Sequence, residues 1–275
     1  MPLPFLTSDL LLPAPAPLYL RYDHFEAHTE YALHCHPWGQ LNRISLGLME
    51  LEVAGQRLMA PADYVVWIPA GMPHAAFVRQ AMQYTSVYVG AEQAQGLPDT
   101  PCLIAQSPLV RALLDDFCLR QVSAMANAGD RCQADLLLQR LAQSGHQASY
   151  LPDSPDRQLQ PILQTIHGNP ADPRTLTQWA QQVHSTERTL ARRFQAELGM
   201  SFVQWRNRAR FLQALVWLKD GWPVQDIATH LNYGSPSAFI AMFHKQVGVS
   251  PERYRRQLQT ASSPSSAAKP ELAIN

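Results

Sequence analysis

Short apolar and alternating segments dominate residues 18–92 and are separated by turn residues. The segments include LNRISLGLMELEV, QRLMA, YVVWIP and MQYTSVYV, and the turns include AGQ and PAGMP. Such segments indicate β-strands, and many short strands in succession indicate an all-β sandwich or barrel. We therefore expect a β-barrel domain over residues 18–92, preceded by an extended arm at residues 1–17.

The pattern becomes helical beyond this domain. Apolar residues recur at spacings of three and four in two stretches, at Val110, Leu113, Leu114 and Phe117 and again at Leu137, Leu138 and Leu141. The two amphipathic helices expected over residues 105–145 can cover the barrel or pair with a second copy of the chain. We expect the second arrangement, a homodimer, in which this segment dimerises the protein or relays a signal.

Prolines mark the next boundary. In SYLPDSPDR, Pro152 and Pro155 interrupt both helix and strand, so residues 146–156 are predicted to form a linker. Helical periodicity then continues almost to the end of the chain, which predicts an all-α domain over residues 157–258. The remaining residues 259–275, which include ASSPSSAAKPELAIN, are predicted to be disordered.

Residues 176–196 have the pattern of a helix-turn-helix. Trp179 and Ala180 lie on the apolar face of a first helix, and Thr186 can cap a second helix whose Leu190 and Phe194 are one turn apart. Two short helices with a small residue at their crossing and a tight corner between them are typical of this DNA-binding motif.

Two arginines of the second helix, Arg188 and Arg192, are four residues apart and therefore point the same way. An arginine can donate two hydrogen bonds to O6 and N7 of guanine, a contact that discriminates against other bases by roughly 1–3 kcal/mol. The alternative is a solvated charged face on which Glu187 pairs locally.

A second unit of the same kind occupies residues 224–246. Ile227 and Ala228 form its inner face, Ser235 can cap its second helix, and Phe239 and Phe243 repeat the core spacing of the first unit. The caps of the two units are 49 residues apart, and SFVQWRNRARFLQALVWLKDG between them is predicted to be a long amphipathic helix. Such a helix could hold two recognition helices about 34 Å apart, so that both enter successive major grooves on one side of a duplex.

Charge separates the two halves of a chain whose net charge is zero. Residues 1–154 carry 8 Lys and Arg against 14 Asp and Glu, a net charge of −6, whereas residues 155–260 carry 13 against 7, a net charge of +6. The basic half is thus expected to meet a polyanion. The proline-broken N-terminus is too short for a membrane span, and the four cysteines form no CxxC pair, so we expect a cytoplasmic protein in a reducing compartment.

The basic half resembles the DNA-binding domain of the AraC/XylS transcription regulators from about residue 159 to residue 256. The resemblance rests on T-x3-L-x-R-x-F from Thr186 to Phe194, LG-x-S-F from Leu198 to Phe202, R-x3-A-L from Arg210 to Leu215, DIA from Asp226 to Ala228, and GVSPERYR from Gly248 to Arg255. It implies a bilobed bundle of about seven helices that binds DNA with both units. His184 and Asn232 replace the usual corner glycine, and both residue types tolerate positive φ.

The resemblance also implies which side chains face DNA. In the first unit these are Thr186, Glu187, Arg188, Thr189, Ala191 and Arg192, and in the second they are Ser235, Pro236, Ser237, Ile240, Ala241 and His244. The second set is more apolar than is usual in the family. It is therefore expected to contact thymine methyl groups or phosphates, and most base discrimination is expected from Arg188 and Arg192.

Three histidines stand out in the acidic half. His34 and His36 would point the same way from one strand, and His74 follows the turn PAGMP. The spacings HxHx3Qx6G and PxGxxH resemble the two motifs of the cupin family, which implies a small jelly-roll barrel with a divalent metal. Here Gln40 stands in place of the family's glutamate, Asp63 in place of a glycine, and Val78 in place of an asparagine.

Three imidazoles can bind Zn²⁺, Ni²⁺, Co²⁺ or Fe²⁺, although a neutral amide holds a cation less strongly than a carboxylate. The candidate metal ligands are His34, His36, Gln40 and His74, and Trp38, Gln40 and Trp67 are candidates for contact with a small-molecule effector. The competing interpretation is a metal-free barrel in which these groups bind each other or an organic ligand, and in which the tryptophans pack in the core.

The expected fold is a two-domain α+β chain: an N-terminal cupin-like jelly-roll β-barrel followed by amphipathic helices, and a C-terminal all-α domain with two helix-turn-helix motifs. We expect a transcription regulator that reads double-stranded promoter DNA, responds to a small-molecule or metal effector and can contact RNA polymerase, without a membrane partner. The alternative is a metal-dependent cupin dioxygenase or isomerase with an accessory helical domain.

Overall fold

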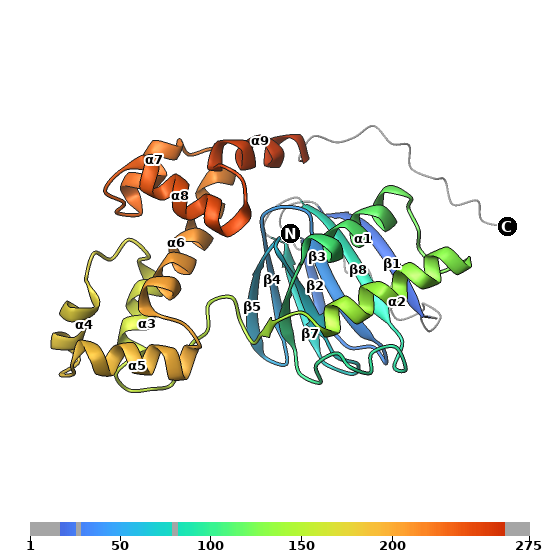
Figure 1. The fold of residues 1–275 in the computed structure, drawn as a ribbon, viewed down its shortest axis with the longest axis horizontal. Coiled ribbons are helices and arrows are strands. Elements are labelled where there is room, and N and C mark those ends of the chain that lie inside the picture. Colours follow the sequence, from blue (N-terminus) through green and yellow to red (C-terminus); the bar gives the residue numbers. More distant parts are fainter. Residues whose placement is uncertain (1–16, 26–28, 79–81, 262–275) are drawn as a thin grey trace.

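The computed structural model describes residues 17–25, 29–78 and 82–261, arranged as a β-rich domain and a helical domain (Figure 1). The predicted N-terminal arm at residues 1–17 lies outside these ranges except for its last residue, and most of the predicted tail lies outside them as well. Residues 259–261, assigned to that tail, instead continue the last helix.

The described residues of the N-terminal domain form two antiparallel sheets. Their orders are β1-β8-β3-β6-β9-β10 and β2-β7-β4-β5. Their inner faces share one apolar core, to which Ile44 and Ile68 come from the first sheet and Leu51 and Leu58 from the second. The strands are β1 Leu18–Phe25, β2 Thr29–His34, β3 Gly39–Ile44, β4 Leu48–Val53, β5 Gln56–Pro61, β6 Tyr64–Ile68, β7 His74–Val78, β8 Met82–Val89, β9 Cys102–Ala105 and β10 His146–Gln147.

The first sheet extends beyond residue 92, where the predicted barrel ended. Strand β9 pairs with β6, and β10 pairs with β9 from within the segment predicted to be a linker. The four-residue run CLIA is too short to show an alternation of polar and apolar residues, and His146–Gln147 has no apolar residue at all. Such strands are recognised only from their pairing partners.

Helices α1 Pro108–Leu119 and α2 Ala128–Ala142 lie along the outer face of the first sheet (Figure 1). Their apolar residues, among them Phe117 and Leu137, share a second core with Leu41, Trp67 and Val87 of the strands. The amphipathic faces therefore cover the sheet, which is the arrangement that we did not expect. A dimer formed through these helices would have to use their other residues.

In the part of the C-terminal domain that the structure describes there are seven helices: α3 Gln160–Gly168, α4 Leu176–Gln182, α5 Glu187–Leu198, α6 Phe202–Lys219, α7 Val224–His230, α8 Pro236–Val247 and α9 Pro251–Ala261. The predicted helix pairs are present as α4 with α5 and α7 with α8, and α6 connects them (Figure 1). The predicted caps are confirmed, because the side chain of Thr186 accepts a hydrogen bond from the N–H of Thr189 and that of Ser235 accepts one from Ala238. His184 and Asn232 have φ values of 51° and 57°, as their corner positions require.

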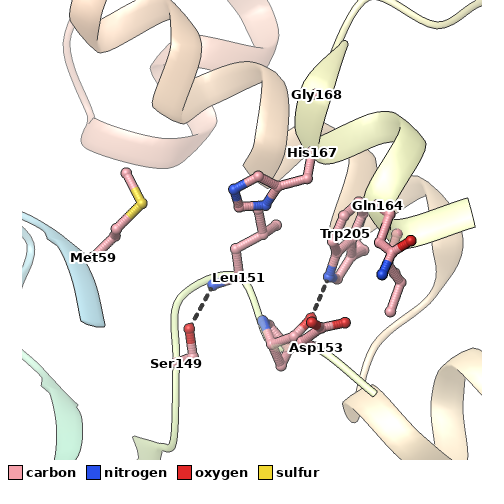
Figure 2. Close-up of a pocket in the computed structure, with 10 residues that line it drawn as sticks. Met59, Ser149, Leu151, Asp153, Gln164, His167, Gly168 and Trp205 are labelled. Carbon is pink, nitrogen blue, oxygen red and sulfur yellow. Dashed lines mark hydrogen bonds between the residues drawn. The ribbon is translucent and has the colours of Figure 1, made fainter. Parts of the chain in front are cut away.

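The linker packs closely against both domains. Tyr150 is buried between Tyr64 of β6 and Phe211 of α6, and Leu151 packs against the core between the sheets and against the core around α3 to α5. The indole N–H of Trp205 donates a hydrogen bond to the carbonyl oxygen of Pro152 at 2.8 Å (Figure 2). These contacts place α6 beside the β-rich domain.

Among the residues that the structure describes, no helix has the length and apolar character needed to cross a membrane.

Candidate metal centre and nucleic-acid interface

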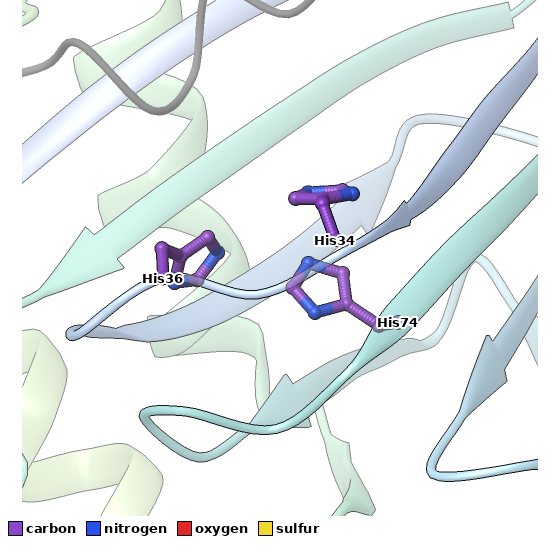
Figure 3. Close-up of side chains that lie close together, drawn as sticks. All are labelled: His34, His36 and His74. Atoms are coloured by element: carbon purple, nitrogen blue, oxygen red, sulfur yellow. The ribbon is translucent and has the colours of Figure 1, made fainter.

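Three histidines of the β-rich domain, His34, His36 and His74, lie close together (Figure 3). One potential ligand atom from each ring lies within 4.8 Å of the others, and the ring centroids of His34 and His74 are 4.3 Å apart. His36 and His74 are buried, with 3% and 4% of their surface exposed, whereas His34 is half-buried. The structure thus brings together the three histidines that the two motifs supply.

Around the histidines, the strand arrangement differs from the expected one at His36. Strand β2 ends at His34, and His36 lies in the segment that leads to β3, so the two histidines do not share a strand. His34 is paired with His74 of β7, and a register shift precedes this pair. The N–H of Gly71 donates to the carbonyl oxygen of His36 at 2.8 Å, and Gly71 has a φ of 72°. The turn PAGMP thereby holds the segment that carries His36.

All three imidazoles are oriented by backbone carbonyl groups. Nδ1 of His34 lies 2.8 Å from the carbonyl oxygen of Ala32, and Nδ1 of His36 lies 2.7 Å from that of Trp38. Nδ1 of His74 lies 2.8 Å from the carbonyl oxygen of Met72. Because a carbonyl oxygen can only accept, each Nδ1 carries the proton. A neutral ring then has its lone pair on Nε2, the atom available to a metal, and this is the usual orientation of a metal-binding histidine.

Gln40 completes the group from strand β3. Its Oε1 lies 2.8 Å from Nε2 of His36 and 3.0 Å from Nε2 of His74, and its amide N–H groups donate to Asn42 and Ser86. Thus the predicted metal-ligand residues are brought together, with the amide oxygen beside the Nε2 atoms of two of the three histidines.

Burial decides the protonation of this cluster. It lowers the pKa of His36, and it lowers the pKa of His74 to about 4. Both rings are therefore neutral near pH 7, and their unprotonated Nε2 atoms face Oε1 of Gln40, which is also an acceptor. A cation held by these atoms would remove the mismatch. A half-turn of the Gln40 and Asn42 amides would remove it without a metal, and Nδ2 of Asn42 has no hydrogen-bond partner among the described residues.

The cavity beside these groups has a volume of about 20 Å³. A single water needs roughly 10–15 Å³, so the cavity has room for about one water or one ion. Sequence analysis missed several polar residues that line it, among them Arg21, Tyr84 and Ser86. They occupy alternate positions of β1 and β8, and only the strand register shows that these positions face inward.

The two tryptophans proposed as effector contacts do not line this cavity. Trp38 stacks on His36 with 5.4 Å between ring centroids. Trp67 pairs with Leu41 across β3 and β6, and both side chains point to the opposite face of the sheet, into the core with α1 and α2. Gly39 is needed there, because a Cβ atom on it would be 2.1 Å from the Trp67 ring. Alternation along β6 makes Val66 and Ile68 the inward residues instead.

The second helix of the first helix-turn-helix presents polar side chains to solvent. Arg188, Ala191 and Arg192 are exposed, and neither arginine forms an ion pair within the described residues. Glu187 instead accepts a hydrogen bond from Thr177 of α4 at 2.5 Å, and Thr189 is half-buried beside the cap at Thr186. Leu190 and Phe194 on its opposite face are fully buried and pack this helix into the domain core.

The corresponding surface of the second unit is mainly apolar or small. Ser235, Pro236, Ser237 and Ala241 are exposed, as is His244 at the following turn. Ile240 exposes 37% of its surface, which is unusual for an isoleucine in a helix whose Phe239 and Phe243 are fully buried. The predicted positions on α8 are therefore accessible to a partner.

Comparisons with known proteins match this architecture. A model described as an AraC-like ligand binding domain matches residues 16–203, and one described as a helix-turn-helix domain matches residues 179–257. The HTH-type transcriptional regulator NimR of Escherichia coli (strain K12) is 34% identical over 239 residues, which cover 87% of this chain and 86% of NimR. The HTH-type transcriptional activator RhaR of Pectobacterium carotovorum subsp. carotovorum (strain PC1) is 27% identical over 144 residues, 50% of this chain and 51% of RhaR.

A solved structure of ToxT from Vibrio cholerae aligns with 90% of this chain and 100% of ToxT, at 11% identity and a TM-score of 0.38. The family assignment rests on the sequence matches. The model of the ligand-binding domain spans more than half of the chain, and NimR is similar over most of both chains. The protein therefore belongs to the AraC family of transcription regulators.

Proposed function

We propose that the protein binds double-stranded promoter DNA through α5 and α8, and that its N-terminal domain binds one divalent transition-metal ion at His34, His36, His74 and Gln40. One observation carries the metal part of the proposal: a potential ligand atom of each of the three imidazoles lies within 4.8 Å of the others, and Nε2 of His36 and of His74 both face Oε1 of Gln40. The family assignment supports a regulator and not the cupin enzyme that the sequence left open.

The DNA part of the proposal rests on accessible side chains with suitable chemistry. Arg188 and Arg192 lie on the exposed face of α5 without a carboxylate partner in the described chain, so their guanidinium groups are available to guanine or phosphate. Helix α8 offers Ile240 and Ala241, which suit the methyl group of thymine. We assign most of the base discrimination to α5 and a supporting role to α8.

The donor set fits a borderline metal. Three neutral imidazoles suit Zn²⁺, Ni²⁺, Co²⁺ or Fe²⁺, and Gln40 would supply an oxygen without adding charge. When bound, the ion supplies the positive charge that lets the Nε2 and Oε1 atoms share one small space. The cavity volume of about 20 Å³ agrees with one ion.

The ion can alter DNA binding only if it favours one arrangement of the two domains. Strand β7, which carries His74, pairs with β4, and β4 packs against α6 between the two DNA-binding units. A change in the conformational order of β7 would thus be transmitted through β4 to α6, the helix that sets the separation of α5 and α8. This chain of contacts supports a regulatory site.

We also propose a homodimer. The faces of α1 and α2 that pack on the sheet are unavailable, but Leu109 exposes 41% and Leu119 84% of their surface on the outer side of α1. A Leu119→Asp variant should sediment as a monomer if this side forms the contact. Leu33→Asp, at another exposed leucine, is the control and should sediment with the mass of the wild-type dimer. Contact with RNA polymerase stays a prediction.

Two measurements on the full chain, prepared without a metal-affinity tag, test the function. Calorimetric titration of the metal-free protein with Zn²⁺ should give one site, and the double variant His34→Ala with His74→Ala should lose it. Selection of bound fragments from genomic DNA should enrich a defined sequence. Recovery of random fragments alone would overturn the regulator, and zinc binding unchanged in the double variant would overturn the metal centre.

A further inference from the structure

A second cavity lies between the two domains and is far larger than the one beside the histidines (Figure 2). It has a volume of about 540 Å³. Met59 on the edge strand β5 lines it from the N-terminal domain, Gln164 and His167 line it from α3, and Trp205 lines it from α6. The linker completes it with Ser149, Leu151, Pro152 and Asp153.

The two cavities differ in volume and therefore in the size of ligand that each can bind. Binding sites for small organic molecules usually have volumes of about 300–1,000 Å³. The cavity between the domains falls in this range, whereas the histidine cavity of about 20 Å³ lies far below it. An adjoining hollow of about 110 Å³ shares Met59, Leu151 and His167 with the larger cavity, so the space continues between β5 and α6.

The lining indicates the chemistry of the ligand. Met59 and Leu151 are half-buried and provide a thioether and a branched alkyl group, which suit a flat aromatic ring. The indole of Trp205 also lines the cavity, although only 1% of this residue is exposed. Gln164 and His167 are exposed at the rim and can hydrogen-bond to polar atoms of a ligand. Among the described lining residues, Asp153 contributes a carboxylate and no lysine or arginine is present, so an anion would find no opposite charge.

We propose that the cavity between the domains binds an aromatic small molecule that carries no negative charge. Such a ligand would touch Met59 of the N-terminal domain and α3 of the DNA-binding domain at once. Leu151, which lies between them in Figure 2, already packs against the cores of both. Occupancy therefore stabilises this relative position of the domains over others. The effect on DNA binding rests on the proposed function, but binding of the ligand does not.

A matched pair of fluorescent probes tests the charge and the location. N-phenylnaphthylamine is uncharged, and anilinonaphthalene sulfonate has the same aromatic skeleton with a sulfonate. Titration of the full-length protein with the first probe should give saturable binding of one molecule per chain. The sulfonate should bind at least tenfold more weakly. Equal affinity for both probes, or no saturable binding of the uncharged probe, would overturn the proposal.

Variants locate the bound probe. Gln164→Trp should fill part of the cavity from an exposed position on α3 and weaken binding of N-phenylnaphthylamine at least tenfold. Gln160→Trp introduces the same side chain at an exposed glutamine of the same helix that does not line the cavity, and should leave the affinity unchanged. If Gln164→Trp does not fold, Ser149→Trp fills the cavity from the linker. Affinity unchanged in a folded cavity variant would overturn the location.

DNA binding measured on the same samples separates the two proposals. A probe that binds and is displaced by Gln164→Trp supports the cavity even if no specific DNA sequence is recovered. Specific DNA binding without probe binding leaves the regulator in place and removes this ligand site. With both present, saturating N-phenylnaphthylamine should change the affinity for DNA of the wild-type protein and not that of Gln164→Trp.

Discussion

The backbone N–H of Gly47 donates a hydrogen bond to the side-chain oxygen of Tyr254 at 2.8 Å, which joins the β-rich domain to the last helix of the DNA-binding domain. Gly47 lies in the turn between β3 and β4 with a φ of 94°, and Tyr254 is 4% exposed. Tyr254 also packs edge-on against Phe243 of α8. Tyr254 thus supports the predicted recognition helix α8 and also hydrogen-bonds to the β-rich domain.

Removing this hydroxyl should loosen the contact between the domains. In Tyr254→Phe the N–H of Gly47 loses its acceptor, and water can replace it only in part, so we expect a loss of about 1 kcal/mol in the free energy of unfolding. Urea denaturation measures the loss, and limited proteolysis of the linker should become faster. Tyr64→Phe is the control, because its ring also lies at the boundary but its hydroxyl has no hydrogen bond in the described structure. Equal losses in both variants would contradict the role of the Gly47 contact.

Two substitutions of Gln40 should change the affinity for metal in opposite directions. Gln40→Glu adds a negative charge beside the Nε2 atoms of His36 and His74 and should tighten Zn²⁺ binding, because a carboxylate holds a cation more strongly than an amide does. Gln40→Ala should weaken it by roughly 10–100-fold, the usual effect of losing a group that supports a metal site. Competition with a chromophoric chelator measures both. If Gln40→Glu binds zinc less tightly than the wild type does, the amide oxygen does not face the ion.

Spacing along the chain predicted the elements whose residues interact locally. The helix pairs, the caps at Thr186 and Ser235 and the positive φ at His184 and Asn232 all follow from contacts within a few residues. The three histidines were also found from spacing, although His36 lies beyond the strand that was expected to carry it. These features depend on periodicity and on the backbone preferences of individual residues.

The features that sequence analysis missed depend on contacts between distant segments. Trp67 faces the helices and not the cavity because β6 pairs with β3 in one register, and a shift of one residue would reverse it. The helices α1 and α2 cover the sheet, although their pattern alone fits a dimer equally well. The cavity between the domains has no motif, because its lining comes from β5, the linker, α3 and α6.

Acid should destabilise the metal-free protein before it protonates its carboxylates. The pKa of His74 is lowered from 6.5 to about 4 by burial, so the unfolded chain takes up a proton at a pH where the folded chain does not. The stability is complete above pH 6.5 and falls as the pH decreases toward 4, by at most about 3 kcal/mol. Urea denaturation at pH 7 and pH 5 measures this difference. His74→Gln should reduce it, and a dependence unchanged in that variant would assign the loss to other groups.

Arg188 and Arg192 should determine which sequences the protein prefers. If each donates to a guanine, Arg188→Ala or Arg192→Ala should cost roughly 1–3 kcal/mol on the selected site and much less on a scrambled site of the same composition. Arg140→Ala, at an exposed arginine of α2, is the control and should affect neither. The dependence of affinity on salt distinguishes the alternative, because each lost phosphate contact lowers the slope of log K against log salt by about 0.9. An equal loss on both sites with a lower slope would make the two arginines phosphate contacts, and base recognition would then have to come from α8, where Ile240 and Ala241 offer only apolar contacts.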